Sequence, residues 1–194
     1  MTMCNDKGEN GMNKNLLIVG AGIYGMVAKE IAESMGCFEK IAFIDDNTRA
    51  LLNGTEVIGR VSDIGCLASD YYNVVIAIGN PEVRLKLIRS IDEKTSCKII
   101  SLISPRAYVS PSAQIEKGCI IEPMAVIQSH CKLEMGCIVS AGAVVNHTST
   151  CCAGVHLDCN ATVEGDCVVP AGTKVCSGEV YKRNGRMNVE ELRF

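Results

Sequence analysis

An aliphatic side chain returns at every sixth residue through the second half of the chain, from Val109 to Val180. Written as twelve rows of six, eleven of the twelve first positions are aliphatic, and ten of the twelve fifth positions are Ala, Cys, Ser or Thr. Neither the 3.6-residue period of a helix nor the two-residue period of a strand produces this pattern. It predicts a β-solenoid, in which each short strand sends one large side chain inward and each tight corner tolerates only a small one.

The period also sets the geometry of this solenoid. Three rows close one triangular coil, so residues eighteen apart stack on the same face, about 4.8 Å from each other. The twelve rows make four coils with a continuous core. An antiparallel barrel is the alternative, but alternating strands would not keep a six-residue register through twelve rows.

The first half of the chain has a different pattern, in which short apolar runs alternate with amphipathic segments. We expect strands over 15–20, 40–44, 74–78 and 98–102, and helices over 23–35, with Gly36 as its stop, and from Pro81 to about Ile91. Such alternation predicts a small parallel α/β, Rossmann-like domain, called the head below. The expected division is a disordered leader over 1–13, the head over 14–104, the β-helix over 105–180 and a C-terminal tail over 181–194.

Three turns of the head carry the residues expected to bind a ligand. Gly20-x-Gly22-x-x-Gly25 joins the first strand to its helix, where glycines let backbone N–H groups approach a phosphate. Asp45 and Asp46 end the second strand, and an acid there can bind a ribose hydroxyl. Gly79 and Asn80 end the third. About 90 residues are too few for a full dinucleotide fold, which disfavours a dehydrogenase and favours a nucleotide-sugar site. The alternative is that these residues only shape the turns.

All three histidines lie in the solenoid rows. Gly165 follows His147 by eighteen residues, so it stacks over His147 and brings a backbone N–H near whatever His147 acts upon. His156 follows His147 by nine residues, which is too far around the prism for one chain to bring both side chains into one pocket. A homotrimer with sites between subunits would do so. His130 is expected at the surface or in an interface.

These groups suit acyl transfer from a thioester. A neutral imidazole takes the proton of an attacking amine or hydroxyl, and backbone N–H groups stabilise the oxyanion. The structural alternative for His147 and His156 is that both are surface or packing residues.

Composition removes several classes of function. A net charge of −3 and a pI near 5.7 disfavour a nucleic-acid-binding protein. No apolar run approaches the ~20 residues of a membrane span, and the first thirteen residues lack the apolar region of a signal peptide. The twelve cysteines form no CxxC pair, so we expect no metal site, and we interpret them as small buried residues of a cytoplasmic protein.

Several motifs together resemble those of the sialic acid O-acetyltransferase and bacillosamine-pathway family, above all the UDP-4-amino-sugar N-acetyltransferases. The matching segments are Gly20-Ala21, Phe43-Ile44-Asp45-Asp46, Ala77-Ile78-Gly79-Asn80 with Glu82 and Arg84, and Val145-x-His147. The resemblance implies a trimeric left-handed β-helix enzyme of surface-polysaccharide biosynthesis that uses acetyl-CoA. It implies a UDP-sugar or sialic-acid-type substrate bound by the head, His147 as the general base, His156 beside the acyl or amide region of acetyl-CoA, and the Gly165 amide on the thioester oxygen.

The chain departs from this family at three places. Thr148 follows His147 where the family has an acid that orients the imidazole, so we expect a neutral acceptor here, most plausibly a backbone carbonyl. Ile23-Tyr24-Gly25 replaces the Gly-His-Gly of the sugar-binding loop, which assigns Ile23 and Tyr24 to the substrate site. The rows stop at Val180, whereas the family continues for several more.

Two other functions remain open at this point. One is a small-molecule O-acetyltransferase of the hexapeptide class, which the nucleotide-type head disfavours. The other is a trimeric scaffold that binds a nucleotide sugar and has weak or no catalytic activity, which the loss of the acid at Thr148 favours.

Overall fold

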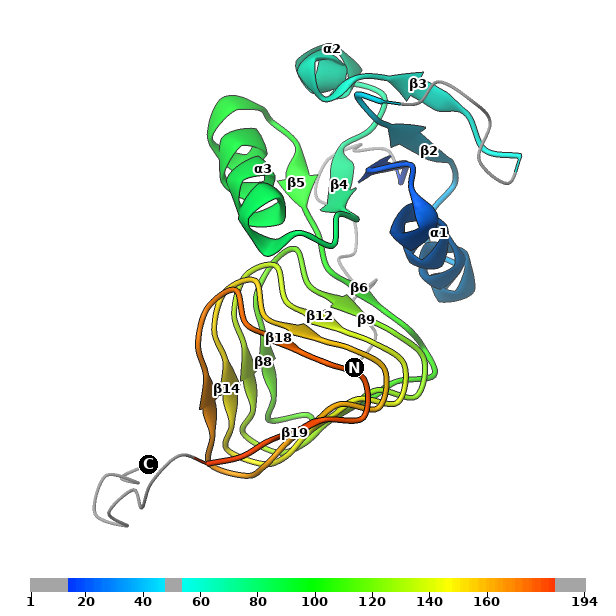
Figure 1. The fold of residues 1–194 in the computed structure, drawn as a ribbon. Helices are drawn as coiled ribbons and strands as arrows, with labels where there is room; N and C mark the ends of the chain where they lie inside the picture. Colours follow the sequence, from blue (N-terminus) through cyan, green and yellow to red (C-terminus); the bar gives the residue numbers. More distant parts are fainter. Residues whose placement is uncertain (1–13, 48–53, 184–194) are drawn as a thin grey trace.

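The computed structural model describes residues 14–47 and 54–183. An α/β head stands on a triangular solenoid, and the chain passes from one to the other between β5 and β6 (Figure 1). The predicted leader and most of the predicted tail lie outside the described residues. Where the two domains divide stays a prediction of the sequence.

The head is a five-stranded parallel sheet in the order β3-β2-β1-β4-β5. Its strands are β1 (Leu16–Val19), β2 (Ile41–Ile44), β3 (Val57–Gly59), β4 (Asn73–Ile76) and β5 (Lys98–Ile99). Helix α1 (Ile23–Met35) packs on one face, while α2 (Ile64–Leu67) and α3 (Pro81–Lys94) pack on the other. A 3₁₀ turn, Val61–Asp63, leads into α2. None of the helices that the structure describes is long and apolar enough to cross a membrane.

The sequence predicted most of these elements. The bounds of α1 are confirmed, with Gly36 in the left-handed conformation that ends the helix. Helix α3 runs one turn beyond the expected Ile91, to Lys94. The segment from β3 to α2 was missed, because a three-residue edge strand and a four-residue helix are too short to show a period.

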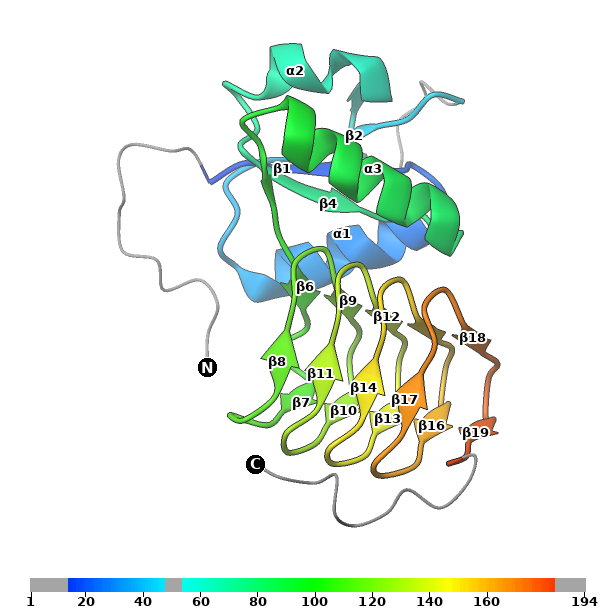
Figure 2. The same ribbon diagram turned by 90° about the vertical axis from the view of Figure 1, so that its left-hand side faces the viewer.

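The solenoid consists of two-residue strands in three parallel sheets, and its coils stack along one axis (Figure 2). The first sheet contains β6 (Leu102–Ile103), β9 (Ile120–Ile121), β12 (Ile138–Val139), β15 (His156–Leu157) and β18 (Lys174–Val175). The second contains β7 (Tyr108–Val109), β10 (Val126–Ile127), β13 (Val144–Val145), β16 (Thr162–Val163) and β19 (Val180–Tyr181). The third contains β8 (Gln114–Ile115), β11 (Lys132–Leu133), β14 (Thr150–Cys151) and β17 (Val168–Val169). Partners are eighteen residues apart, as Val126 and Val144 are. This confirms the predicted stacking.

The first and fifth residues of each hexad lie where the sequence predicted. The aliphatic first positions fill the interior, and most of the small fifth positions are buried beside them. Cysteine and serine suit the fifth position because they also donate a hydrogen bond to the next coil. The thiols of Cys131 and Cys137 reach the carbonyls fifteen residues ahead at 2.9 and 3.3 Å, and the Ser149 hydroxyl does the same at 2.8 Å. The described cysteines are free thiols.

The solenoid extends by one strand beyond the predicted rows at each end. The expected strand over 98–102 is divided, because Ile99 pairs with Val74 in the head whereas Leu102 pairs with Ile120 in the solenoid. At the other end Tyr181, assigned to the tail, lies in β19 and packs on the core. Its ring occupies the first position of a thirteenth row, a place that the search for aliphatic residues overlooked.

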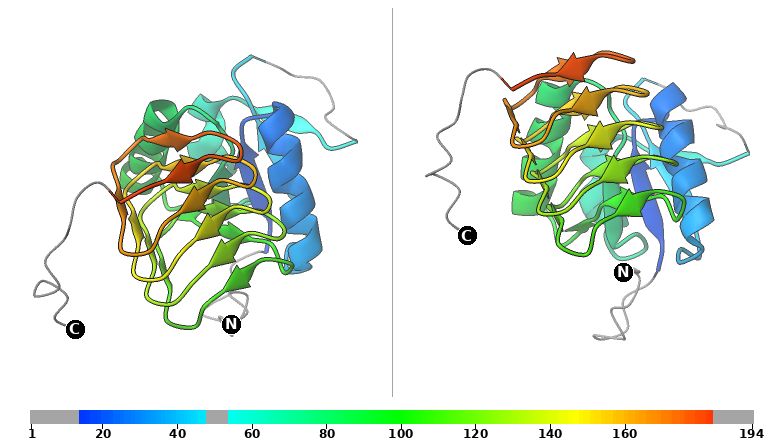
Figure 3. Two further views of the ribbon diagram at one scale, coloured as in Figure 1. Left: turned by 60° about the horizontal axis from the view of Figure 1, so that its bottom comes forward. Right: turned by 90° about the horizontal axis from the view of Figure 1, so that it is seen from below.

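Two helices of the head pack against the solenoid. Helix α1 lies over the sheet that contains β6, β9, β12, β15 and β18, here called the docking sheet, and shares a core with its outward-facing residues. Helix α3 lies along one corner of the prism, where a Cβ on Gly118 would lie 2.8 Å from Ile88 and one on Gly154 would lie 2.8 Å from Leu85. No described element of the head packs on the sheet of β7, β10, β13, β16 and β19 (Figure 3).

Arg84 of α3 joins these parts from a fully buried position. Its guanidinium donates to the carbonyl oxygens of Gly136 at 2.7 Å and Gly154 at 2.9 Å in two successive coils. It also donates to those of Ile78 at 2.6 Å and Gly79 at 2.8 Å in the turn after β4. Burial lowers the pKa of Arg84 from its usual value, and the four carbonyl groups replace the lost hydration. One side chain therefore ties the Gly79-Asn80 turn to the β-helix.

Candidate active site

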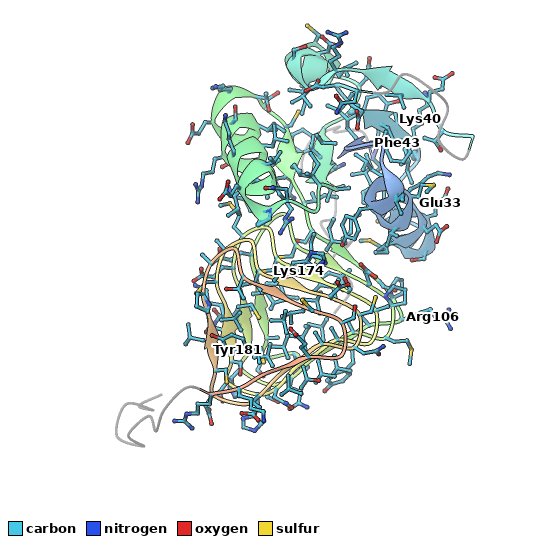
Figure 4. The ribbon with its side chains drawn as sticks, viewed as in Figure 1. Glu33, Lys40, Phe43, Arg106, Lys174 and Tyr181 are labelled. Carbon is cyan, nitrogen blue, oxygen red and sulfur yellow. The ribbon has the colours of Figure 1, made fainter. Side chains whose placement is uncertain are left out.

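His147 lies at the corner of the prism between β13 and β14. This corner is on the side away from the head, where β19 ends (Figure 1). The Tyr181 side chain points from β19 into the interior of the prism (Figure 4). At the His147 corner the chain turns through Thr148, whose φ of 57° is in the left-handed region. The His147 N–H donates to Gln128 Oε1 at 3.3 Å, and the Thr148 N–H donates to the Ser129 carbonyl at 2.9 Å. The coil below therefore fixes the backbone of the corner.

The imidazole of His147 packs directly against Gly165 in the coil above. A Cβ on Gly165 would lie 2.8 Å from Cε1 and 3.0 Å from Nε2 of the ring. These distances confirm the predicted stacking of the two residues. They also show that the ring fits only because residue 165 has no side chain.

The partner of the imidazole differs from the expected one. His147 Nδ1 lies 3.1 Å from the hydroxyl oxygen of Thr148, and that hydroxyl donates a short hydrogen bond to Asp166 Oδ1. The expectation of a backbone carbonyl was wrong, because the left-handed turn at Thr148 brings its side chain alongside the ring. Asp166 was missed, although it stacks eighteen residues beyond Thr148 by the same register that places Gly165.

His156 occupies a different face of the molecule. It lies in β15 on the docking sheet, half-buried, with its ring centroid 6.3 Å from that of Tyr24 in α1 and its Nε2 3.4 Å from the Ser140 hydroxyl. Burial first, and then the positive charge of Lys174, lowers the pKa of His156 to about 4. Within one chain the structure does not bring His156 to His147.

His130, the third histidine, occupies the corner position one coil below Thr148 and is exposed. Its N–H donates to the Ser112 hydroxyl at 3.1 Å. This is the surface position that the sequence predicted.

In the head, packing requires two glycines of the Gly20-x-Gly22-x-x-Gly25 turn, and the third leaves room for a ligand. Gly20 has a φ of 106°, and a Cβ there would lie 2.9 Å from the Ala77 carbonyl oxygen; one on Gly25 would lie 2.2 Å from the Gly20 oxygen. These two glycines are therefore required by packing alone. Gly22 differs, because it begins α1 without a side-chain cap and a Cβ there would meet nothing within 4 Å. Its surroundings leave room for a ligand at the start of the helix.

Ile23 and Tyr24 follow Gly22 and face different surroundings. Ile23 is 82% exposed beside the turn. The hydroxyl of Tyr24 is buried against the solenoid and has no hydrogen-bond partner among the described residues. Burial, and then the negative charge of Glu122, raises the pKa of Tyr24 well above its usual value.

The polar residues predicted to bind the nucleotide hold the turns in place. Asp45 accepts from the Ala21 N–H at 2.8 Å and from the Asn47 N–H at 2.7 Å, which fastens the glycine turn to β2. Asp46 accepts from the Val61 N–H at 3.0 Å. Asn80 caps α3 by accepting from the Val83 N–H at 3.1 Å. Their roles toward a ligand stay predictions.

No candidate residue lines either of two hollows in the head, of about 350 and 320 Å³. The first lies between α2 and α3, and the second lies beside α1 and β2. Within 14–47 and 54–183, no group of three or more His, Cys, Asp or Glu side chains is placed to hold a metal ion.

Two family models match the chain. The PglD N-terminal domain matches residues 15–91, and the bacterial transferase hexapeptide (six repeats) matches residues 112–147. UDP-N-acetylbacillosamine N-acetyltransferase of Bacillus subtilis (strain 168) is 32% identical over 112 residues, which are 56% of this chain and 51% of that protein. The chain therefore spans about half the length of this curated relative.

Solved structures match over more of the chain. The acetyltransferase domain of PglB from Neisseria gonorrhoeae FA1090, in complex with acetyl coenzyme A, has a TM-score of 0.76 and 30% identity, with 87% of each chain covered. A mutant of perosamine N-acetyltransferase from Caulobacter crescentus, in complex with CoA and GDP-perosamine, has a TM-score of 0.67 and 22% identity over 91% of this chain and 90% of that one, which shows the fold alone. With these matches the fold is the predicted one, a Rossmann-like head followed by a left-handed parallel β-helix.

Proposed function

Because the chain belongs to the bacillosamine-pathway family of hexapeptide-repeat sugar N-acetyltransferases, we propose that it transfers the acetyl group of acetyl-CoA to an amino group of a nucleotide-linked sugar. Membership of the family supports the reaction, and the names of the relatives support the substrate class. The Bacillus relative is by name an N-acetyltransferase of a UDP-linked sugar, and the Neisseria structure contains acetyl coenzyme A. The amino group is therefore favoured over the hydroxyl that the sequence left open.

The observation that carries the proposal is the imidazole of His147 held beneath Gly165 at an open corner of the β-helix. In the reaction we propose, the amine nitrogen attacks the thioester carbonyl and gives its proton to Nε2 of His147. The carbon–nitrogen bond forms, the carbon–sulfur bond breaks, and the proton passes to the departing thiolate of CoA. The Gly165 N–H, which has no acceptor among the described residues, is a donor for the developing oxyanion.

The nucleotide would bind at the carboxyl ends of β1, β2 and β4. Open α/β sheets bind ligands at this edge, and the first turn of α1 offers backbone N–H groups to a diphosphate. The open space at Gly22 supports this assignment. Asp45 and Asn80 would contribute mainly by holding the turns that surround it.

We further propose a homotrimer in which the head of one subunit and the His147 corner of the next form one site. In a single chain the head lies over the docking sheet, whereas the His147 corner is on the opposite side of the triangle (Figure 1). His156, which faces the head, would then lie near the acyl end of acetyl-CoA bound between subunits. A cytoplasmic location stays a prediction from the sequence.

The test is release of CoA thiol from acetyl-CoA with a panel of acceptors: UDP- and GDP-linked 4-amino sugars, free sialic acid and serine. We expect turnover with a nucleotide-linked amino sugar, and a loss of about 10²- to 10⁴-fold in His147→Ala. Binding of the nucleotide sugar without thiol release would favour the scaffold instead. Turnover with serine alone would favour the small-molecule transferase, and unchanged turnover in His147→Ala would remove the assigned base.

A further inference from the structure

We propose that Thr148 and Asp166 act together as positioning residues for His147, with the threonine hydroxyl relaying the negative charge of a carboxylate in the next coil. The inference rests on the proposed function of His147 as the base. It replaces the acid that the family has immediately after this histidine with a pair drawn from two coils.

The direction of the hydrogen bonds follows from counting protons. The carboxylate of Asp166 can only accept, so the single hydroxyl proton of Thr148 points to Asp166. The hydroxyl oxygen then faces His147 Nδ1, 3.1 Å away, with its lone pairs, and can only accept from it. The neutral imidazole therefore carries its proton on Nδ1 and keeps the Nε2 lone pair for the substrate.

The backbone at Thr148 supports a role for its side chain. The fourth position of every row is the corner residue, and six of the twelve are glycine. Thr148 has a φ of 57° there, a conformation that is costly for a β-branched residue. His130, Asn160 and Asp166 also have positive φ at corner positions, but Thr148 is the β-branched residue among the described ones that do, so its side chain is present at a cost in backbone strain.

The surroundings also hold Asp166 in place. Its N–H donates to the His147 carbonyl at 3.1 Å, and its second carboxylate oxygen lies 3.9 Å from the guanidinium of Arg183. Arg183 in turn donates its backbone N–H to Glu164 at 3.2 Å. Below, His130 occupies the corner one coil down. Arg183, Glu164 and His130 are charged or titratable groups near the pair, and so is the thiol of Cys167, whose pKa is raised by burial and then by the charge of Glu164.

In the reaction, Nε2 gains the proton of the amine and the ring becomes positively charged. The Nδ1 proton stays on the ring and the hydroxyl proton stays on Thr148, so no proton reaches Asp166. The carboxylate stabilises the imidazolium through the polarised hydroxyl and keeps the ring in one orientation.

The test measures kcat and kcat/KM across pH for wild type, for four variants of Thr148 and Asp166, and for one control variant. Asp166→Asn keeps an acceptor for the hydroxyl and removes the charge, whereas Thr148→Val keeps the shape and removes the hydroxyl. We expect each to lower kcat at least tenfold. The acid limb of the Asp166→Asn profile should also move to lower pH, because the protonated ring has lost a nearby anion. Thr148→Ser, which restores the hydroxyl, should recover most of the activity.

Thr148→Gly separates this role from one in folding. It should raise the melting temperature, because the turn is no longer strained, and still lose activity like Thr148→Val. Met124→Gly is the matched control: its φ is 64°, it is 65% exposed, and it lies in a lower coil, so it should raise the melting temperature without loss of activity.

Retention of at least half of wild-type kcat with an unchanged pH profile in Asp166→Asn and Thr148→Val would overturn the relay. If His147→Ala is inactive in the same assay, the proposed function stands without it. If His147→Ala keeps wild-type turnover, the assignment of His147 as the base fails, and the relay fails with it. Absence of turnover in wild type with every nucleotide-linked amino sugar would instead contradict the proposed function.

Discussion

At the scale of single residues, Gly165 is the glycine whose missing side chain makes room for the His147 imidazole. Its φ is outside the left-handed region, so its backbone conformation accepts a side chain, but the space above His147 does not. Gly165→Ala should therefore fold like wild type and displace the imidazole, because a ring yields more easily than backbone. In the thiol-release assay we expect kcat to fall on the order of 10²-fold, as it does for other misplaced catalytic groups.

The control for this substitution is Gly65→Ala in α2, where an added Cβ meets nothing within 4 Å. It should leave kcat unchanged. A Gly165→Ala variant with wild-type kcat would show that the ring can move without loss, and that the contact with Gly165 has no catalytic meaning.

At the scale of elements, the packing of β15 under α1 makes stability depend on pH through His156. Its pKa is about 4 in the folded protein, because burial and the charge of Lys174 disfavour the imidazolium, against about 6.5 in an unfolded chain. Below pH ~6.5 the unfolded state binds a proton that the folded state rejects, so this contribution to stability is complete above pH ~6.5 and is lost as the pH falls toward 4.

His156→Gln should remove this part of the acid destabilisation. The measurement is the urea midpoint at pH 7 and at pH 4.5, and the difference between the two should be smaller in the variant than in wild type. His130→Gln, at an exposed corner, should keep the wild-type difference. Equal pH dependence in His156→Gln and wild type would assign the acid sensitivity to other groups.

At the scale of the whole molecule, a site between subunits predicts complementation between two inactive proteins. His147→Ala lacks the base, and Gly22→Glu places a negative charge where the nucleotide diphosphate would bind, at a position with room for the side chain. Unfolded together and refolded as mixed trimers, they should recover roughly a quarter of wild-type activity, the share of sites that random assortment leaves intact.

Each variant refolded alone is the control and should stay inactive. Light scattering should give the mass of three chains for both. Recovery of no activity from well-folded mixed trimers would place the base and the nucleotide in one subunit. A stable monomer that is active would exclude the shared site altogether.

How much of this could be read from the sequence depends on the range of each interaction. The hexad determined the solenoid, its eighteen-residue register and the stacking of Gly165 on His147, because a repeated coil converts sequence distance directly into spatial distance. The same register places Asp166 above Thr148 and shows that the fourth position of the hexad is rich in glycine. The sequence analysis missed both because it considered only the aliphatic first position and the small fifth position. Most strands and helices of the head could be predicted because the apolar pattern of each lies within one short segment of the chain.

Only the tertiary structure decided how the head and the solenoid meet. The four carbonyl groups around Arg84 come from one turn of the head and two coils, more than fifty residues apart in sequence, and no local pattern predicts a buried guanidinium there. The same holds for the direction of the Thr148 hydroxyl and for the ring of His156 beneath Tyr24. Periodicity fixes which residues share a face, because it follows from backbone geometry; the partner of each polar side chain depends on which surfaces the folded chain brings together.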